Sequence, residues 1–356
     1  MLFDIYKNKK VFITGHTGFK GSWLSLWLSR IGAKIYGYSL KPNTILNHFD
    51  ILSLNNLFAK SYFADINDYD TLEKSLIESN PDIIFHLAAQ PLVRYSYNNP
   101  LETFQTNAIG TLNILSCARK LKNLKAIVVI TTDKVYENKE WLWGYRENEP
   151  LGGYDPYSAS KACAEIITNS MRRSFFNVEQ FEQTHQVLIS SVRAGNVIGG
   201  GDWSEDRLIP DIIKGIEKNK MAIIRNPNAI RPWQHVLEPL CGYLILGEKL
   251  LEGKKEFATS FNFGPNNEDD LSVKEVLNLA VLFWNKISYQ IQVDLNAPHE
   301  ANLLMLDISK ARKMLDWKPI LNSSQAVEWT IKWYKEFYER KNILTYKQLE
   351  DYMEKL

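Results

Sequence analysis

The stretch Val11-Phe-Ile-Thr-Gly-His-Thr-Gly-Phe-Lys-Gly21 decides the fold, because it joins an apolar run to glycines at every third position. Residues 11–14 have the composition of a strand buried on both faces, and residues 22–31 have helical apolar spacing. A glycine turn between a strand and a helix brings backbone N–H groups and the helix N-terminus against a pyrophosphate. The stretch therefore predicts a dinucleotide site, with an ordinary tight turn as the alternative.

Outward from this stretch, strand-like and helical segments alternate. The alternation predicts parallel βαβ units with right-handed crossovers, and hence an α/β fold with a Rossmann-type doubly wound parallel sheet. We expect a dinucleotide-binding domain over 1–198, to which 235–262 return, and a smaller, mostly C-terminal substrate-binding domain over 199–234 and 263–356. The expected strands are 34–40, 60–64, 83–86, 126–130, 187–192 and 289–293, and the expected helices are 69–78, 108–121, 236–250, 271–286 and two or more within 323–356.

Composition and charge exclude several classes of protein. The 356 residues are 45% hydrophobic, which suffices for a substantial core, and a net charge of +1 gives no field that favours nucleic acid or an anionic membrane. No apolar run approaches the roughly 20 residues of a membrane span, and the N-terminus lacks the apolar region of a signal peptide. Cys117, Cys163 and Cys241 have no paired spacing, which argues against disulfides and against a zinc site. We expect a cytoplasmic protein without metal, nucleic acid or membrane partner.

A candidate reaction centre follows a later strand. The apolar run Ala126–Ile130 ends in Thr131-Thr-Asp-Lys134, and Tyr157 and Lys161 share one face of an expected helix. A neighbouring ammonium stabilises a phenolate and lowers the pKa of a tyrosine, so this pair can supply a base. Taken alone, Tyr-x-x-x-Lys is more often a surface pair than a catalytic one. For Asp133 and Lys134, the alternative to a catalytic role is an exposed turn.

The end of the second expected strand bears on the type of cofactor. It reads Tyr38-Ser-Leu-Lys41, without the carboxylate that usually holds the adenosine ribose. Ser39 can hydrogen-bond a ribose hydroxyl, whereas Lys41 can attract a phosphate, so these residues leave NAD and NADP open. Asp65, after the third expected strand, is either an acceptor for the adenine amino group or a turn residue.

Several motifs follow one another in a set order. The first five are Gly15-x-x-Gly-x-x-Gly21, Asp65, His86-Leu-Ala-Ala-Gln90, Asn107-x-x-Gly-Thr111 and Tyr157-x-x-x-Lys161, and the later ones are Arg193-Ala-Gly-Asn-Val197, Arg231-Pro-Trp-Gln-His-Val236 and Leu306-Asp-Ile-Ser-Lys310. Together they resemble the extended short-chain dehydrogenase/reductases, in the branch that modifies nucleotide sugars. The resemblance implies NAD as the cofactor, held by Gly15, Thr17, Gly18, Phe19, Lys20, Gly21, Ser39, Asp65, Ile66, Leu87, Ala88, Ala89, Asn107, Tyr157 and Lys161.

The residues Thr132-Asp-Lys134 discriminate between activities within that branch. Dehydratases of nucleotide-activated hexoses typically carry Thr-Asp-Glu there, and lysine in place of glutamate resembles the CDP-glucose 4,6-dehydratases. The resemblance implies CDP-glucose as the substrate, with Tyr157 as base for the 4-hydroxyl, Thr132 bonded to the 4-oxygen and Lys161 on the nicotinamide ribose.

Elimination of water needs two further groups. Asp133 is the expected acid at the 6-hydroxyl and Lys134 the expected base at carbon 5, which requires a raised pKa for the first and a lowered pKa for the second. The alternatives are a nucleotide-sugar 4-epimerase and a dehydratase of a GDP-, dTDP- or UDP-hexose. A nonenzymatic dinucleotide sensor would have no use for Tyr157, Lys161 and Asp133 together.

Residues of the second half are expected to hold the substrate. An arginine fork suits a diphosphate, which makes Arg207 and Arg231 candidates for the nucleotide, and the resemblance adds Gln90, Arg94, Asn196 and Trp233. For Arg193, binding of the nucleotide and a structural ion pair are equal alternatives. His235 is expected to be packed rather than catalytic. The resemblance also implies that Asn107 arranges the helix of Tyr157 and Lys161 or a water. It suggests a homodimer or homotetramer built on helices near 101–122 and 156–174.

Overall fold

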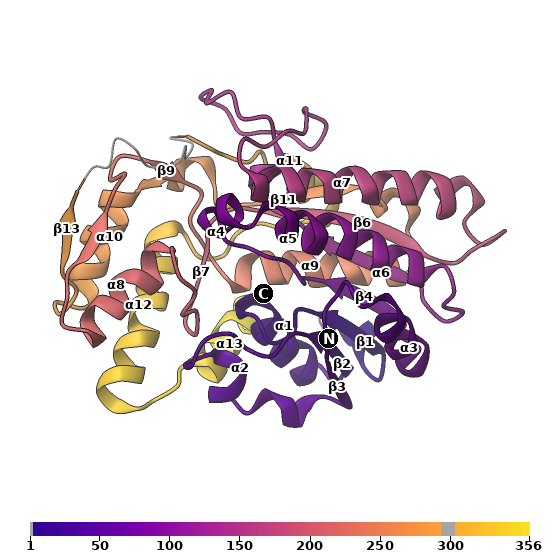
Figure 1. Ribbon diagram of the computed structural model, residues 1–356, viewed down its shortest axis with the longest axis horizontal. Helices are drawn as coiled ribbons and strands as arrows, with labels where there is room; N and C mark the ends of the chain where they lie inside the picture. The colour runs from indigo at the N-terminus through magenta and orange to yellow at the C-terminus, as the bar shows by residue number, and fades with distance from the viewer. Residues whose placement is uncertain (1–2, 293–302) are drawn as a thin grey trace.

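A seven-stranded parallel sheet forms the centre of the molecule in the computed structural model, which describes residues 3–292 and 303–356 (Figure 1). The strand order is β3-β2-β1-β4-β5-β6-β11, so the chain turns back between β1 and β4, as doubly wound sheets do. This arrangement confirms the predicted α/β fold. The strands are β1 (Lys10–Thr14), β2 (Lys34–Ser39), β3 (Lys60–Phe63), β4 (Ile83–His86), β5 (Ala126–Ile130), β6 (Leu188–Ala194) and β11 (Ser260–Phe263).

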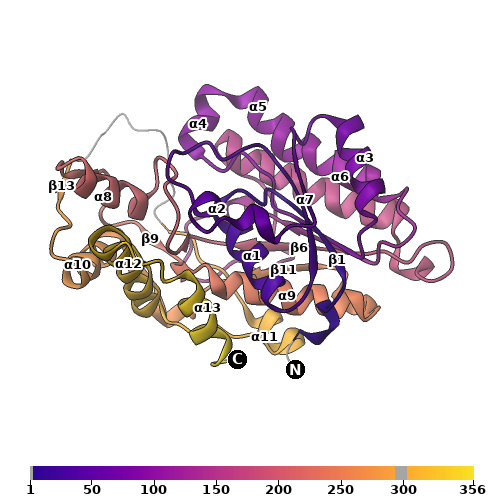
Figure 2. The ribbon, with the colours of Figure 1, turned by 90° about the horizontal axis from the view of Figure 1, so that it is seen from below.

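Helices cover both faces of this sheet (Figure 2). One core contains Ile127 and Val129 of β5, and the opposite core contains Ala126, Val128 and Ile130. Successive side chains of a strand point to opposite faces, so a strand between two helical layers is buried on both sides, and β5 is apolar throughout. The first face carries α3 (Tyr69–Ser79), α4 (Val93–Asn98), α5 (Pro100–Phe104), α6 (Gly110–Ala118) and α7 (Pro156–Phe175), and the second carries α1 (Phe19–Arg30) and α9 (Leu237–Leu251).

A third core lies beside the sheet and is built from the later part of the chain. It packs α8 (Leu208–Glu217), α10 (Val273–Phe283) and α12 (Ser323–Arg340) around β8 (Ala222–Ile224) and β13 (Tyr289–Ile291). β11 and α9 return to the main sheet and its second face, so the chain passes between the two regions more than once. The remaining elements are α2 (His48–Ile51), β7 (Val197–Ile198), β9 (Ile230–Arg231), β10 (Gln234–His235), β12 (Leu271–Ser272), α11 (Ser309–Leu315) and α13 (Thr345–Met353), besides short 3₁₀ turns.

Some expected boundaries need correction. The expected helix 108–121 continues a π-helical turn, Gln105–Ile109, and its α-helical part ends at Ala118. The expected helix 271–286 begins at Val273, because Ser272 caps it through a reciprocal bond with Glu275. The last part of the expected strand 289–293, Val293, lies outside the described residues. Within the part of the chain that the structure describes, no helix combines the length and the apolar character needed to cross a membrane.

Candidate active site

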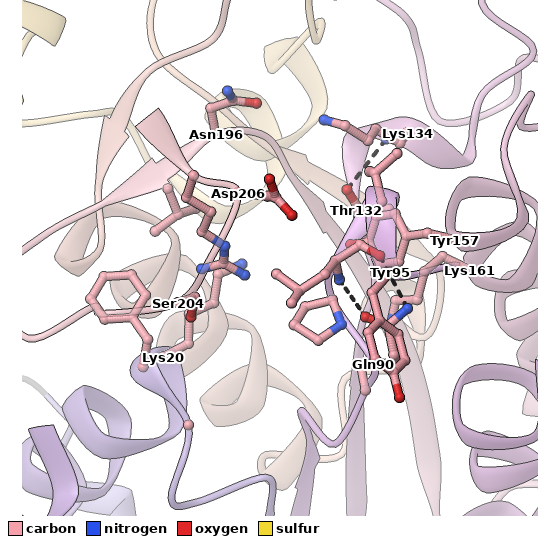
Figure 3. A pocket seen from close by; sticks show the side chains of 18 of the residues that line it. Lys20, Gln90, Tyr95, Thr132, Lys134, Tyr157, Lys161, Asn196, Ser204 and Asp206 are labelled. Atoms are coloured by element: carbon pink, nitrogen blue, oxygen red, sulfur yellow. Dashed lines mark hydrogen bonds between the residues drawn. The ribbon is translucent and has the colours of Figure 1, made fainter. Parts of the chain in front are cut away.

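A cavity of about 1520 Å³ opens at the carboxyl edge of the sheet. Its wall includes the glycine turn after β1, the segments after β4 and β5, the start of α7 and the segment after β7. In open parallel sheets, ligands bind at this edge, where the strand order turns back. Figure 3 shows Thr132, Lys134, Tyr157 and Lys161 on one wall, with Lys20, Asn196 and Ser204 across the cavity.

The glycine turn fits the close approach of a dinucleotide. Gly15 has a φ of +72°, and a Cβ on it would lie 2.8 Å from the Ala88 amide nitrogen. A Cβ on Gly21 would lie 2.1 Å from the Gly15 carbonyl oxygen, so this glycine lets α1 start directly against the turn. The turn therefore presents the N-terminus of a twelve-residue helix to the cavity, as a pyrophosphate site requires. The expected cofactor residues that line the cavity here are Gly15, Thr17, Gly18, Phe19, Lys20 and Gly21.

A second part of the wall lies beyond the turn, at the ends of β2 and β3. Thr17 Oγ1 lies 2.9 Å from Ser39 Oγ and donates to the Leu40 carbonyl oxygen, which orders both hydroxyls at the cavity edge. Asp65 accepts from the Asn67 amide through Oδ1 at 2.8 Å, so it is a turn residue and a wall residue at once. The other expected cofactor residues that line the cavity are Ile66, which follows Asp65, and Leu87, Ala88 and Ala89, which follow β4.

The five expected catalytic residues line the same cavity. The helix that carries Tyr157 and Lys161 begins where Asp155 accepts from the Ser158 amide at 2.9 Å, with proline at its first position. Lys161 Nζ donates to the Ile130 carbonyl oxygen at 2.8 Å, so the helix docks on the end of β5. This contact brings the Tyr-Lys pair to the segment that follows β5.

Asp133 is buried within that segment. Its Oδ1 accepts from Thr132 Oγ1 at 2.9 Å and lies 3.7 Å from Lys134 Nζ. Its Oδ2 faces Gly195, where a Cβ would lie only 2.6 Å away. The alternative of an exposed turn is therefore wrong for Asp133, which is 1% exposed, whereas Lys134 is partly exposed at the cavity.

The pKa of Tyr157 differs from the expected one. Burial raises the pKa of Tyr157 to about 12, and the hydrogen bond with Thr132 only partly opposes this effect. The expected lowering by Lys161 is not found, because burial dominates and the ammonium donates to Ile130 instead. Burial lowers the pKa of Lys161 to about 8, and the carboxylate of Glu165 acts in the opposite direction.

Cationic side chains gather near the glycine turn. Burial, together with the nearby charges of Arg207 and Lys161, lowers the pKa of Lys20 to about 7. Three cations that repel one another at a cavity edge favour an anion such as a diphosphate. The described residues contain no group of His, Cys, Asp and Glu side chains able to hold a metal ion.

The expected substrate residues differ in how they meet the cavity. Arg94, Asn196, Arg207 and Arg231 line it. Arg207 Nη1 donates to Asp202 at 2.8 Å, and Arg94 Nε lies 3.9 Å from Asp206, so both guanidinium groups are held by carboxylates at the cavity wall.

Three expected site residues bond to other parts of the fold: Gln90 and Trp233 still line the cavity, whereas Asn107 does not. The Gln90 amide donates to Leu92 and Thr103 and accepts from the Leu92 amide, which closes its own loop. Asn107 is fully buried outside the cavity wall and bonds to the Gln90 backbone and to Ser160 Oγ, so it arranges helix α7 rather than contacting a ligand. Trp233 reaches the wall, but its ring packs in the third core and its indole donates to the Leu271 carbonyl oxygen at 2.9 Å.

Two alternatives left open by the sequence are decided. Arg193 forms a buried bidentate ion pair with Glu165, at 2.9 Å for Nε and 3.0 Å for Nη2. His235 is buried against Trp23 and Trp329, and burial lowers its pKa to about 3, so it is packed as expected.

Three residues that sequence reasoning missed complete the site. Glu165 lies one turn after Lys161, a spacing that could have indicated it, and Gly195 makes room for Asp133. Asp202 holds Arg207, but no local pattern distinguishes it from an ordinary loop carboxylate.

The fold and the site together define a protein class. A doubly wound parallel sheet with a glycine turn and a Tyr-Lys pair in one cavity is the architecture of an extended short-chain dehydrogenase/reductase. A sequence model of the family described as GDP-mannose 4,6 dehydratase matches residues 12–330, and the chain belongs to this family.

Individual relatives agree with this assignment. The chain is 48% identical over 352 residues to a CDP-glucose 4,6-dehydratase of Salmonella typhimurium, covering 98% of each chain. A dTDP-glucose 4,6-dehydratase of Bacillus anthracis in complex with NAD superposes with a TM-score of 0.75 at 22% identity, over 96% of this chain and 99% of that chain. A UDP-glucose 4-epimerase of Thermotoga maritima gives 0.78 at 19% identity, over 92% and 99%. At these two identities the structural likeness shows the fold alone.

Proposed function

We propose that the protein is a CDP-glucose 4,6-dehydratase, which converts CDP-D-glucose to CDP-4-dehydro-6-deoxy-D-glucose and water. The observation that carries this proposal is the buried Asp133, paired with Lys134, in the cavity that also holds Thr132, Tyr157 and Lys161. A 4-epimerase needs the tyrosine and the cofactor but no acid and base for elimination. The similarity to the Salmonella dehydratase supports CDP-glucose over the other nucleotide sugars.

The order of the steps follows from the acidity of carbon 5. Its proton is not acidic in glucose, but it becomes acidic beside a ketone at carbon 4, because the resulting carbanion is an enolate. Gly15 and Gly21 form a cradle with room for NAD, which, when bound, would supply the acceptor for the hydride of carbon 4 and its donor for carbon 6. Oxidation and reduction therefore balance within one turnover, and no net change of the cofactor is expected.

The residues of the chain supply the proton transfers. Tyr157 accepts the proton of the 4-hydroxyl, and Thr132, which is hydrogen-bonded to Tyr157, orients the 4-oxygen. Protonated Lys161 supplies positive charge beside the nicotinamide ribose. Lys134 removes the proton from carbon 5 and Asp133 protonates the departing 6-hydroxyl, which their placement in one segment at the cavity allows. Lys134 returns its proton to carbon 5 as the hydride reaches carbon 6.

We propose a homodimer or homotetramer built on α5, α6 and α7. These helices lie together on one face of the sheet, where Leu101 of α5 is 71% exposed and Ile166 of α7 is 57% exposed, and Ile109 of the π-helical turn before α6 is 46% exposed. Exposed apolar side chains on adjacent helices favour burial against a second copy.

We also propose that the chain divides into two domains, one formed by 1–198 with 235–262 and the other by 199–234 with 263–356. The free state of Cys117, Cys163 and Cys241 supports a reducing cytoplasm.

Incubation with nucleotide sugars tests the proposed function. The purified protein is given CDP-glucose, and separately dTDP-, GDP- and UDP-glucose, with NAD but no NADH, and the alkali-induced absorbance of 4-keto-6-deoxy sugars is followed. Product from CDP-glucose, reduced by about 100-fold in Lys134→Ala, is expected if Lys134 is the base. Lys60→Ala, on an exposed side chain that pairs with Glu78 outside the cavity wall, is the matched control. Inversion at carbon 4 without a keto product would refute dehydration and favour the epimerase.

A further inference from the structure

The segment from Gly199 to Arg207 forms the cavity wall opposite the reaction centre and ends at α8. It carries four charged side chains: Asp202, Glu205, Asp206 and Arg207. The proposed chemistry does not explain what orients them. Figure 3 shows Ser204 and Asp206 of this segment across the cavity from Thr132 and Tyr157. Whatever holds this segment therefore sets the shape of the second wall.

The glycines at its start are pressed against helices from distant parts of the chain. A Cβ on Gly200 would lie 2.0 Å from Cγ of Trp333 in α12, and a Cβ on Gly201 would lie 2.4 Å from Cδ2 of His48. The Trp23 indole of α1 donates to the Gly200 carbonyl oxygen at 3.0 Å. The start of the segment is thus anchored by α1, α2 and α12.

Tyr334 fixes the residue that follows these glycines. Its hydroxyl accepts from the Asp202 amide at 3.0 Å and donates to the Asp202 carbonyl oxygen at 2.5 Å. Both residues are buried, so this one hydroxyl satisfies the backbone N–H and C=O of Asp202 away from water. Without it, both groups would be left unpaired or the segment would have to move.

Asp202 passes this constraint on to Arg207. Its Oδ1 accepts from the Ser204 amide at 3.0 Å, and its Oδ2 accepts from Arg207 Nη1 at 2.8 Å. Two bonds on the two oxygens fix the plane of the carboxylate, and a planar carboxylate fixes the guanidinium that it holds. The Arg207 side chain remains 32% exposed at the cavity, with donors left for a ligand.

We propose that Tyr334, from helix α12, is a positioning residue that aims Arg207 at the diphosphate of the nucleotide sugar through Asp202. The proposal rests on the proposed function, because the diphosphate belongs to that class of substrate. It makes helix α12 part of substrate binding, although Tyr334 itself does not line the cavity.

The test compares three variants by steady-state kinetics with CDP-glucose, by calorimetric binding of CDP and by thermal unfolding. Tyr334→Phe is expected to raise the KM and the Kd for CDP about tenfold with kcat nearly unchanged, because binding is lost while the reaction centre is intact. Asp202→Asn keeps the backbone bonds to Tyr334 but removes the negative charge that pairs with Arg207. The same rise of the KM and of the Kd for CDP is expected. Tyr352→Phe is the matched control, since it removes another buried hydroxyl, which donates to Glu238 at 2.8 Å. It is expected to lower the unfolding temperature without raising KM.

Two results would overturn the proposal while leaving the proposed function in place. One is a wild-type KM and CDP affinity in Tyr334→Phe, with CDP-glucose still converted. The other is an equal rise of KM in Tyr352→Phe, which would indicate a general loss of packing. A wild-type protein that neither binds CDP nor converts CDP-glucose would overturn the proposed function, and this assignment with it.

Discussion

Replacing Glu165 with glutamine perturbs the buried charges beneath the reaction centre. Glu165 accepts four hydrogen bonds, from Thr131, Ser191 and two nitrogens of Arg193, at 2.6 to 3.0 Å. Glu165 and Arg193 are 3% and 2% exposed, so neither charge has access to bulk water. The substitution keeps the volume of the side chain but removes the negative charge and turns one acceptor into a donor.

The expected loss of stability follows from these contacts. Breaking a buried ion pair by removing one partner costs about 3–5 kcal/mol, because the other charge stays buried without compensation. The glutamine NH₂ group would also face a donor, either the Arg193 guanidinium or a hydroxyl hydrogen that must rotate away. We therefore expect the free energy of unfolding to fall by about 4 kcal/mol.

Urea unfolding followed by tryptophan fluorescence measures this loss. The double variant Glu165→Gln/Arg193→Met removes both charges, and we expect it to recover most of the stability that the single variant loses. A loss below about 1 kcal/mol in the single variant would refute the assignment of an uncompensated buried charge. So would a double variant that is no more stable than the single one.

Two further predictions concern one steric contact and one pH dependence. Gly195→Ala should lower kcat about tenfold or more, because its Cβ would lie 2.4 Å from Pro232 Cγ and 2.6 Å from Asp133 Oδ2. Gly264→Ala, whose nearest neighbour is at 3.5 Å, should leave kcat unchanged, and equal effects of the two would contradict the steric argument. Burial raises the pKa of Glu238 from its ordinary 4.5 to about 7, although bonds from Leu321, Tyr352 and Ile320 oppose this. The unfolded chain loses this proton first, so about 3 kcal/mol of stability present below pH 4.5 should disappear as the pH rises to about 7. Glu238→Gln should flatten the stability curve over that range, and an unchanged slope in urea unfolding at several pH values would sink this prediction.

Local patterns were sufficient for the main elements of the fold. The strand–glycine–helix order at 11–31 and the apolar run Ala126–Ile130 predicted β1, α1 and β5, because burial on both faces leaves no polar position in a central strand. The short helices α4 and α5 were not expected, since five or six residues carry too little periodicity. The start of α10 was placed two residues early, because the reciprocal bond between Ser272 and Glu275 decides it.

The sequence by itself determined which residue types supply the chemistry: the glycine turn, the Tyr157–Lys161 pair and the adjacent Asp133 and Lys134 all follow from spacing or from family motifs. The tertiary structure decided how these side chains are held. Asn107 and Gln90 carry the same amide group as Asn196, yet Asn107 bonds to Ser160 away from the cavity wall, whereas Gln90 bonds to Thr103 and still lines the cavity. Such a contact joins residues far apart in the chain, and its formation depends on packing in three dimensions, which no local pattern encodes.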